Sequence, residues 1–288
     1  MLQYEIARIT VPPVPAALTL AGPNPNFGPP NSANFGISGT EDPSCSSAGG
    51  AVPAIGTTTD VGNSQTGASA TQVASLAASS IATTLQGPGV KTQNFTGAGC
   101  TATQGGDDVQ NVINVAPSYS TVAGLNAVVQ SVIGAADIVT SNPSTITNYG
   151  QPISGVAVPQ TIAITGNADV SGLSGGSGIL LVTGNMVASG NFSWNGTILV
   201  IGTGSVTFNG GGGGSLNGAV VVANIALEDH LHDYASNPSE ANLASALGSP
   251  TFNFNGGGGN FLQYNSCLTT ASTAHSTFKV LARREIVY

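Results

Sequence analysis

Apolar residues recur at a fixed spacing between residues 161 and 223. Gly166, Gly184 and Gly202 lie 18 residues apart, and a further copy of the pattern follows after 22 residues. Short β-branched runs between Gly, Asn and Ser turns, at a period near 20 residues, are typical of a solenoid in which each copy forms one coil. We therefore predict a mainly β protein built as a parallel β-helix. Its inward positions are Ile162, Ile164, Leu180, Val182, Ile198, Val200, Val220 and Val222.

The residues between these positions are also apolar. Side chains alternate along a strand, so Ala163, Leu181, Leu199 and Val221 should point outward. A strand that is apolar on both faces has to be covered on both faces. The simplest cover is a helix of the same chain, and the alternative is another subunit.

The flanking segments supply further strands and helices. Helical spacing predicts a helix over 71–86, a second over 121–137 behind a Ser120 cap, and a short third over 237–247. Strands are predicted at 2–11, 17–20, 251–254 and 277–288. We expect one domain of 288 residues, with N-terminal strands, loops and helices over 1–150. The solenoid and its closing strand take up 151–288, and two or three helices pack outside it.

Charge is unusually sparse in this chain. Charged residues make up 6 % of the sequence and the formal net charge is −8, which argues against nucleic acid as a partner. There is no run of 18 apolar residues, so no membrane span is expected. The three cysteines are too scattered for a zinc site, and one disulfide with one leftover thiol suits an oxidising compartment. Together these features favour an extracellular or cell-surface protein.

Candidate chemistry is limited to a few residues. His230 and His232 in a strand would share one face and could bind a metal ion, although the alternative is a solvated loop. Asp169 is the single carboxylate between residues 161 and 223, where there is no Lys, Arg or His. A polysaccharide hydrolase or lyase would need ionisable groups on successive coils. We therefore expect no enzymatic activity, no catalytic residues and no cofactor.

Three stretches resemble the extracellular region of bacterial PilX-type pilus-assembly proteins, an uncharacterised group of Acidobacteria-like genomes. They span residues 15–30, residues 190–202 with Trp194-Asn-Gly, and the tail from 255 through Tyr264-Asn-Ser-Cys267 to 286. Members of that group carry an N-terminal hydrophobic helix, which this sequence does not show. The resemblance implies a pilus-associated role and a disulfide between Cys45 and Cys267, because both lie in or beside the resembling stretches.

The expected function is that of a structural subunit of a cell-surface filament or pilus-associated assembly. Terminal strands that are left unpaired tend to pair with other chains. They could complete the sheet of the next subunit, or they could pair within one subunit. The alternative function is a surface adhesin, a module that binds glycans or ice, although the Thr165 and Thr183 ladder is broken by Ile201. The residues expected to carry assembly are Leu2, Tyr4, Ile6, Ile9, Phe278, Val280 and Ile286.

Overall fold

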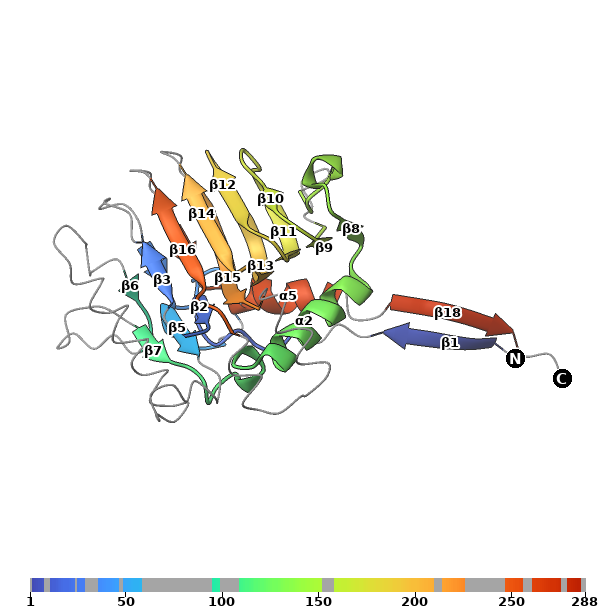
Figure 1. Ribbon diagram of the computed structural model, residues 1–288, viewed down its shortest axis with the longest axis horizontal. Helices are drawn as coiled ribbons and strands as arrows, with labels where there is room; N and C mark the ends of the chain where they lie inside the picture. The colour runs from blue at the N-terminus through green and yellow to red at the C-terminus, as the bar shows by residue number, and fades with distance from the viewer. Residues whose placement is uncertain are drawn as a thin grey trace.

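The protein is mainly β, with two large parallel sheets and two α-helices in the part of the chain that the structure describes (Figure 1). This computed structural model describes residues 2–7, 11–23, 25–28, 36–46, 49–58, 95–98, 109–151, 158–209, 214–225, 247–255, 261–275 and 279–285. The predicted helices over 71–86 and 237–247 lie outside the described residues, apart from Leu247, which is not helical.

Parallel strands form two sheets. The larger one, here called the large sheet, contains β2 (Leu18–Ala21), β4 (Gly36–Ser38), β5 (Ile55–Thr58), β6 (Phe95–Thr96), β7 (Val109–Asn111), β8 (Ile138–Thr140), β9 (Gln160–Ile164), β11 (Gly176–Val182), β13 (Trp194–Gly202), β15 (Ser215–Asn224) and β17 (Phe261–Gln263). The small sheet has the order β10 (Ala168–Asp169), β12 (Met186–Ser189), β14 (Ser205–Asn209), β16 (Thr251–Asn255) and β3 (Asn26–Gly28). From β9 to β17 the chain enters the two sheets alternately.

The register of the repeats is the one that the sequence period predicts. Leu180 pairs with Ile162 on one side and with Ile198 on the other, and Ile198 pairs with Val220. All eight predicted inward residues are buried, in strands that are parallel to their neighbours. The prediction of stacked parallel strands with these residues in the core is therefore confirmed.

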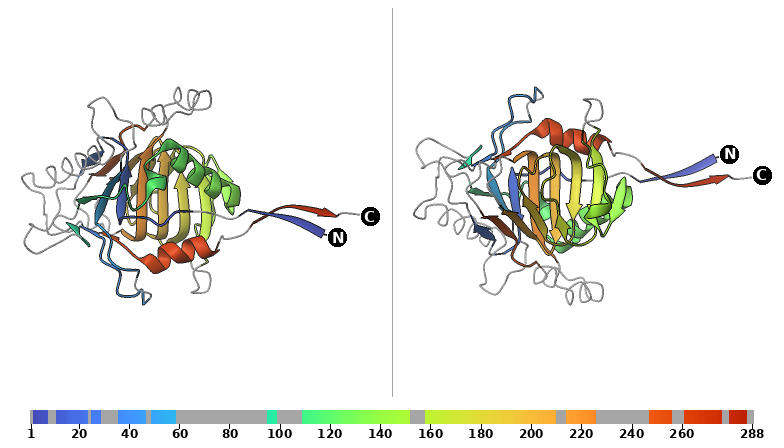
Figure 2. Two further views of the ribbon diagram at one scale, coloured as in Figure 1. Left: turned by 90° about the horizontal axis from the view of Figure 1, so that it is seen from below. Right: turned by 90° about the horizontal axis from the view of Figure 1, so that it is seen from above.

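The outward residues of the large sheet are covered within the same chain. Ala163, Leu181, Leu199 and Val221 are fully buried. Helix α5 (Ser266–His275) contacts the four strands that carry them, and α2 (Val122–Ala135) contacts β9 and contributes to the same core. Figure 2 shows the two helices running along the stack of strands on different sides.

Helix α2 matches its predicted position closely, but its cap differs. The hydroxyl of Thr121 accepts a hydrogen bond from the Gly124 N–H, and this contact caps the helix. The Ser120 hydroxyl donates instead to the carbonyl of Pro117, at the end of the 3₁₀-helix η3 (Pro117–Tyr119). Helix α5 was not predicted, because its Ser/Thr-rich sequence has no apolar stripe of helical period.

The strands from β2 to β7 belong to the same sheets as the repeats. Residues 220–223 of β15 pair with β2, and residues 215–217 of β15 pair with β17. Two short strands from opposite ends of the chain therefore lie along the same side of β15, one after the other. In the small sheet, β3 pairs with β16 in the same way. These described strands of the N-terminal half therefore do not stand apart from the repeats that follow them.

A row of glycines with an unusual backbone conformation crosses the large sheet. Gly178, Gly196 and Gly218 pair with one another across β11, β13 and β15, and each has a positive φ, from 113° to 139°. L-residues with side chains rarely adopt this conformation. The sequence repeat therefore places this glycine conformation at the same point of each of these strands.

Candidate functional site

The two ends of the chain form a projecting two-stranded ribbon. β1 (Leu2–Ala7) and β18 (Lys279–Glu285) pair antiparallel, from Leu2 opposite Glu285 to Ala7 opposite Lys279, with an irregularity between Glu5 and Ile6. They form a sheet of their own, and no other described strand pairs with either. Figures 1 and 2 show this ribbon extending away from the body, with both chain ends beyond it.

Of the two arrangements considered for the terminal strands, the chain shows the intramolecular one. Leu2, Tyr4 and Ile6 lie in β1 and Val280 lies in β18, each opposite a residue of the other strand. Ile9, Phe278 and Ile286 lie outside the described residues. Exchange of a single terminal strand between subunits would first have to break this pairing, whereas the outer edge of each strand remains available.

The ribbon segments differ from the body in charge, a signal that reading the overall net charge alone overlooks. Four of the five Lys and Arg residues lie in the first or last ten residues: Arg8, Lys279, Arg283 and Arg284. With Glu5 and Glu285, these two terminal segments carry a formal charge of +2. The rest of the chain carries −10, which together makes the total of −8. An acidic body therefore bears a basic extension.

A disulfide joins distant parts of the chain next to the place where the N-terminal strands meet the repeats. Cys45 and Cys267, the pair that the resemblance implies, are bonded with a Cα–Cα distance of 5.5 Å and a sequence separation of 222. Cys45 follows β4, and Cys267 lies in the first turn of α5, just after β17. Because β4 and β17 are neighbours in the large sheet, the bond closes a very long loop at a contact that the sheet already makes. Cys100 lies outside the described residues.

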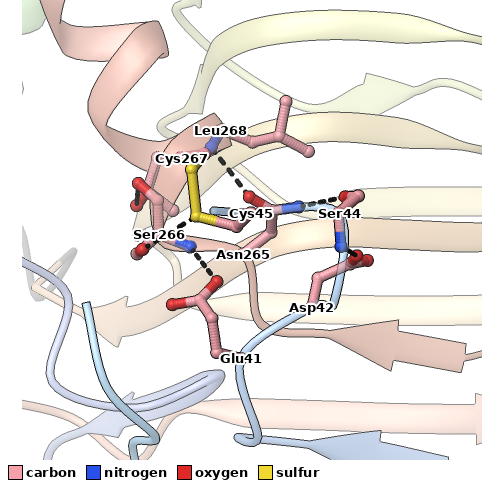
Figure 3. The surroundings of a disulfide bond; sticks show 9 residues. Glu41, Asp42, Ser44, Cys45, Asn265, Ser266, Cys267 and Leu268 are labelled. Atoms are coloured by element: carbon pink, nitrogen blue, oxygen red, sulfur yellow. Dashed lines mark hydrogen bonds between the residues drawn. A yellow bond between two sulfur atoms is a disulfide. The ribbon is translucent and has the colours of Figure 1, made fainter. Parts of the chain in front are cut away.

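Polar groups hold the start of α5 beside this disulfide (Figure 3). The Glu41 carboxylate accepts from the Ser266 N–H at 2.8 Å, and the Asn265 side-chain oxygen accepts from the Leu268 N–H at 3.0 Å. These bonds satisfy N–H groups that a helix start leaves without an intrahelical partner. The arrangement is a structural clamp between the N-terminal segment and α5.

Two ionisable groups beside this clamp have pKa values that are shifted by their surroundings. Hydrogen bonds from the side chain and N–H of Ser44 lower the pKa of Asp42, so this carboxyl group is ionised at neutral pH. Burial, with a smaller contribution from the charge of Glu41, raises the pKa of Tyr264. Both shifts move the pKa of the group away from neutral pH.

The described residues form neither a metal-binding cluster nor a membrane-spanning helix. His230 and His232 lie outside them, so their proposed metal role stays a prediction. Among the described residues, no three His, Cys, Asp or Glu side chains come together as a metal site would require. No described helix combines the length and the apolar character needed to cross a membrane.

Comparison of the chain with protein-family models, with curated proteins and with solved structures found no match.

Proposed function

We propose that this protein is a non-enzymatic extracellular structural protein, a subunit of a cell-surface filament or pilus-associated assembly. The observation that carries the proposal is the terminal ribbon, which extends from the body and pairs with no other strand of the described chain. A short two-stranded ribbon is at best marginally stable alone in water. A contact with another molecule would stabilise it.

The proposed body is a β-helix whose coils pass in turn through the large and the small sheet. Support comes from the alternation of sheets between β9 and β17 and from the uninterrupted parallel pairing of equivalent residues. Such a stack is rigid along its axis and resists proteolysis, because most of its backbone is hydrogen-bonded between coils. These properties suit a structural subunit.

The proposed partner of the ribbon is the acidic body of a second copy. The terminal segments carry +2 and the remainder carries −10, so unlike surfaces meet in a head-to-tail contact. Each ribbon strand also retains one outer edge that can pair with a further strand. A contact between two different surfaces of the same molecule repeats without closing when its rotation does not form a ring, and it then produces a filament.

An extracellular setting is supported by the disulfide and by the resemblance to PilX-type proteins. Disulfides persist in oxidising compartments and are rare in the cytosol. The absence of enzymatic activity is supported by the strands from β9 to β15, in which Asp169 is the single ionisable side chain. A row of acidic or basic groups on successive coils is missing from these strands.

The proposal is tested by reversing charges on the ribbon. The double variant Arg283→Glu and Arg284→Glu should keep the fold but abolish filaments seen by negative-stain microscopy, because both ribbon and body are then acidic. Lys91→Glu is the matched control, since it changes a charge of the same sign outside the terminal segments. Wild-type assembly should also weaken as salt rises and screens the contact.

Two results would contradict this function. One is a wild-type protein that stays monomeric in sedimentation experiments at high concentration and low salt. The other is a ribbon-deleted chain, lacking residues 1–10 and 277–288, that still forms the same filaments. Circular dichroism of each variant shows whether the body has remained folded.

A further inference from the structure

A cavity of ≈ 600 Å³ opens at the β10 edge of the small sheet, away from the clamp and the ribbon. One wall is formed by the turns that follow β8, including the 3₁₀-helix η4 (Pro143–Thr145), and the other by the loop after β10. Its volume lies within the range of about 300–1,000 Å³ that is usual for small-molecule sites. Among the residues that line it are Asn142, Tyr149, Gln151, Asp169, Ser171 and Leu173.

The two amide side chains in this cavity are held in defined orientations. The Asn142 side-chain oxygen accepts from the N–H and the hydroxyl of Ser144, at 3.1 and 2.7 Å. The Gln151 side-chain oxygen accepts from the Tyr149 N–H at 2.9 Å. In each amide the oxygen is thus occupied, and the amino group has no hydrogen-bond partner among the described residues. Two donors are therefore oriented before any ligand arrives.

Tyr149 and Asp169 add two further kinds of group. The Tyr149 hydroxyl donates to the Pro143 carbonyl at 3.0 Å, which fixes a half-buried aromatic ring in the wall. Asp169 is exposed and accepts from the Ser171 N–H at 3.0 Å. Hydrogen bonds from the Ser171 side chain and N–H lower the pKa of Asp169, so it is an ionised acceptor at neutral pH.

This set of groups discriminates between classes of ligand. The described residues that line the cavity include no Lys, Arg or His, and their one ionisable carboxyl group is negative, so an anionic ligand is disfavoured. One carboxylate is too little for a calcium site, which takes six to eight oxygen ligands. Hydroxyl-rich ligands both donate and accept hydrogen bonds, and they present C–H faces that pack on an aromatic ring. That combination is found in neutral sugars.

We propose that the cavity bounded by η4 and the loop after β10 binds a neutral oligosaccharide. The amino groups of Asn142 and Gln151 donate to sugar hydroxyls, Asp169 accepts from them, and the ring of Tyr149 packs against one sugar face. No ribbon residue is among the described residues that line this cavity, so a single subunit should bind the sugar whether or not its ribbon can assemble.

The test uses four neutral trisaccharides as probes: maltotriose, cellotriose, mannotriose and triacetylchitotriose. Trigalacturonic acid is the anionic comparator. Binding is measured by ligand-observed NMR titration, on the wild type and on the ribbon variant Arg283→Glu and Arg284→Glu. We expect at least one neutral probe to bind both proteins equally and the anionic probe to bind at least about tenfold more weakly.

Two isosteric variants locate the site. Asn142→Asp and Gln151→Glu keep the oxygens that accept from Ser144 and Tyr149, but they replace the donating amino groups. Each should weaken binding by about tenfold, the effect of losing one good hydrogen bond to a ligand. The control is Asn26→Asp, the same kind of change at the opposite edge of the small sheet, where binding should be unchanged.

The proposal is overturned if none of the neutral probes binds at about 10 mM, a weak limit on the affinity scale. It is also overturned if the anionic probe binds as well as the neutral ones, or if Asn26→Asp reduces binding as much as the two cavity variants. If the ribbon variant lost sugar binding while the two cavity variants kept it, the sugar would instead bind at the ribbon.

Discussion

Both large and small sheets are built from parallel strands, but their outward side chains differ in polarity and burial. In the large sheet, the outward residues Leu181 and Leu199 are fully buried beneath elements of the same chain. In the small sheet, the outward residues Thr207 and Asn253 are partly exposed, and Asn255 is exposed. Both inner faces are apolar. The large sheet is mainly aliphatic there, whereas the small sheet contributes a cluster of stacked and tilted rings from Phe27, Phe208, Phe252 and Phe254.

The difference shows that the outward residues of the repeats decide whether a sheet face must be covered or can face water. An apolar outward row requires cover, and the strands that α2 and α5 contact most belong to the large sheet. A polar outward row can face water, and on the small sheet an amide pair, Asn255 to Asn209 at 3.2 Å, links neighbouring strands. The large sheet thereby anchors the fold, and the small sheet remains accessible at the edge where the proposed sugar cavity lies.

The largest expected effect comes from placing a carboxylate on the outer surface of each sheet in turn. Leu199→Asp would place a carboxylate without a partner in the covered row, and it should lower the free energy of unfolding by more than about 4 kcal/mol. Thr207→Asp, its counterpart on the small sheet, should cost about 1 kcal/mol or less, because the charge stays hydrated. Urea denaturation of both variants measures the difference. Equal losses would show that the small sheet is covered as well.

A smaller effect is expected from removing the disulfide, which reinforces the large sheet where β4 meets β17. Cys267→Ala, studied together with Cys45→Ala, should lower the free energy of unfolding by about 2–4 kcal/mol, since a long loop is released in the unfolded chain. Amide hydrogen exchange should accelerate in β4 and β17 more than in β3 and β16, the corresponding junction of the small sheet. Uniform acceleration in both junctions would contradict a local reinforcement.

The smallest expected effect concerns the row of positive-φ glycines in the large sheet, which the described strands of the small sheet do not share. Gly196→Ala should cost about 1–3 kcal/mol, because φ is 135° and an added Cβ would overlap the carbonyl oxygen of Gly178. Gly134→Ala is the matched control in α2, where a Cβ meets nothing within 4 Å. It should stabilise the protein by about 0.5–1 kcal/mol. The temperature of thermal unfolding should fall for Gly196→Ala and rise for Gly134→Ala.

The sequence by itself determined the repeats. Side chains at equivalent places in successive repeats must occupy equivalent positions in neighbouring parallel strands, so the spacing of Ile162, Leu180 and Ile198 was enough to predict their register and burial. The same periodic reasoning located α2, whose apolar stripe follows the helical period. It also showed that both faces of the large sheet needed cover. These features depend on local or periodic patterns, which a sequence displays directly.

The tertiary structure alone decided how the non-repeating segments are placed. β2, β3 and β4 join β15, β16 and β17 through backbone hydrogen bonds, which depend little on side-chain identity and leave no pattern in the sequence. The same is true of the pairing of β1 with β18 and of the cavity between η4 and the β10 loop, whose residues come from turns without a shared period. Helix α5 forms over an apolar surface despite its weak helical pattern, because tertiary packing supplies the stability that its own sequence lacks.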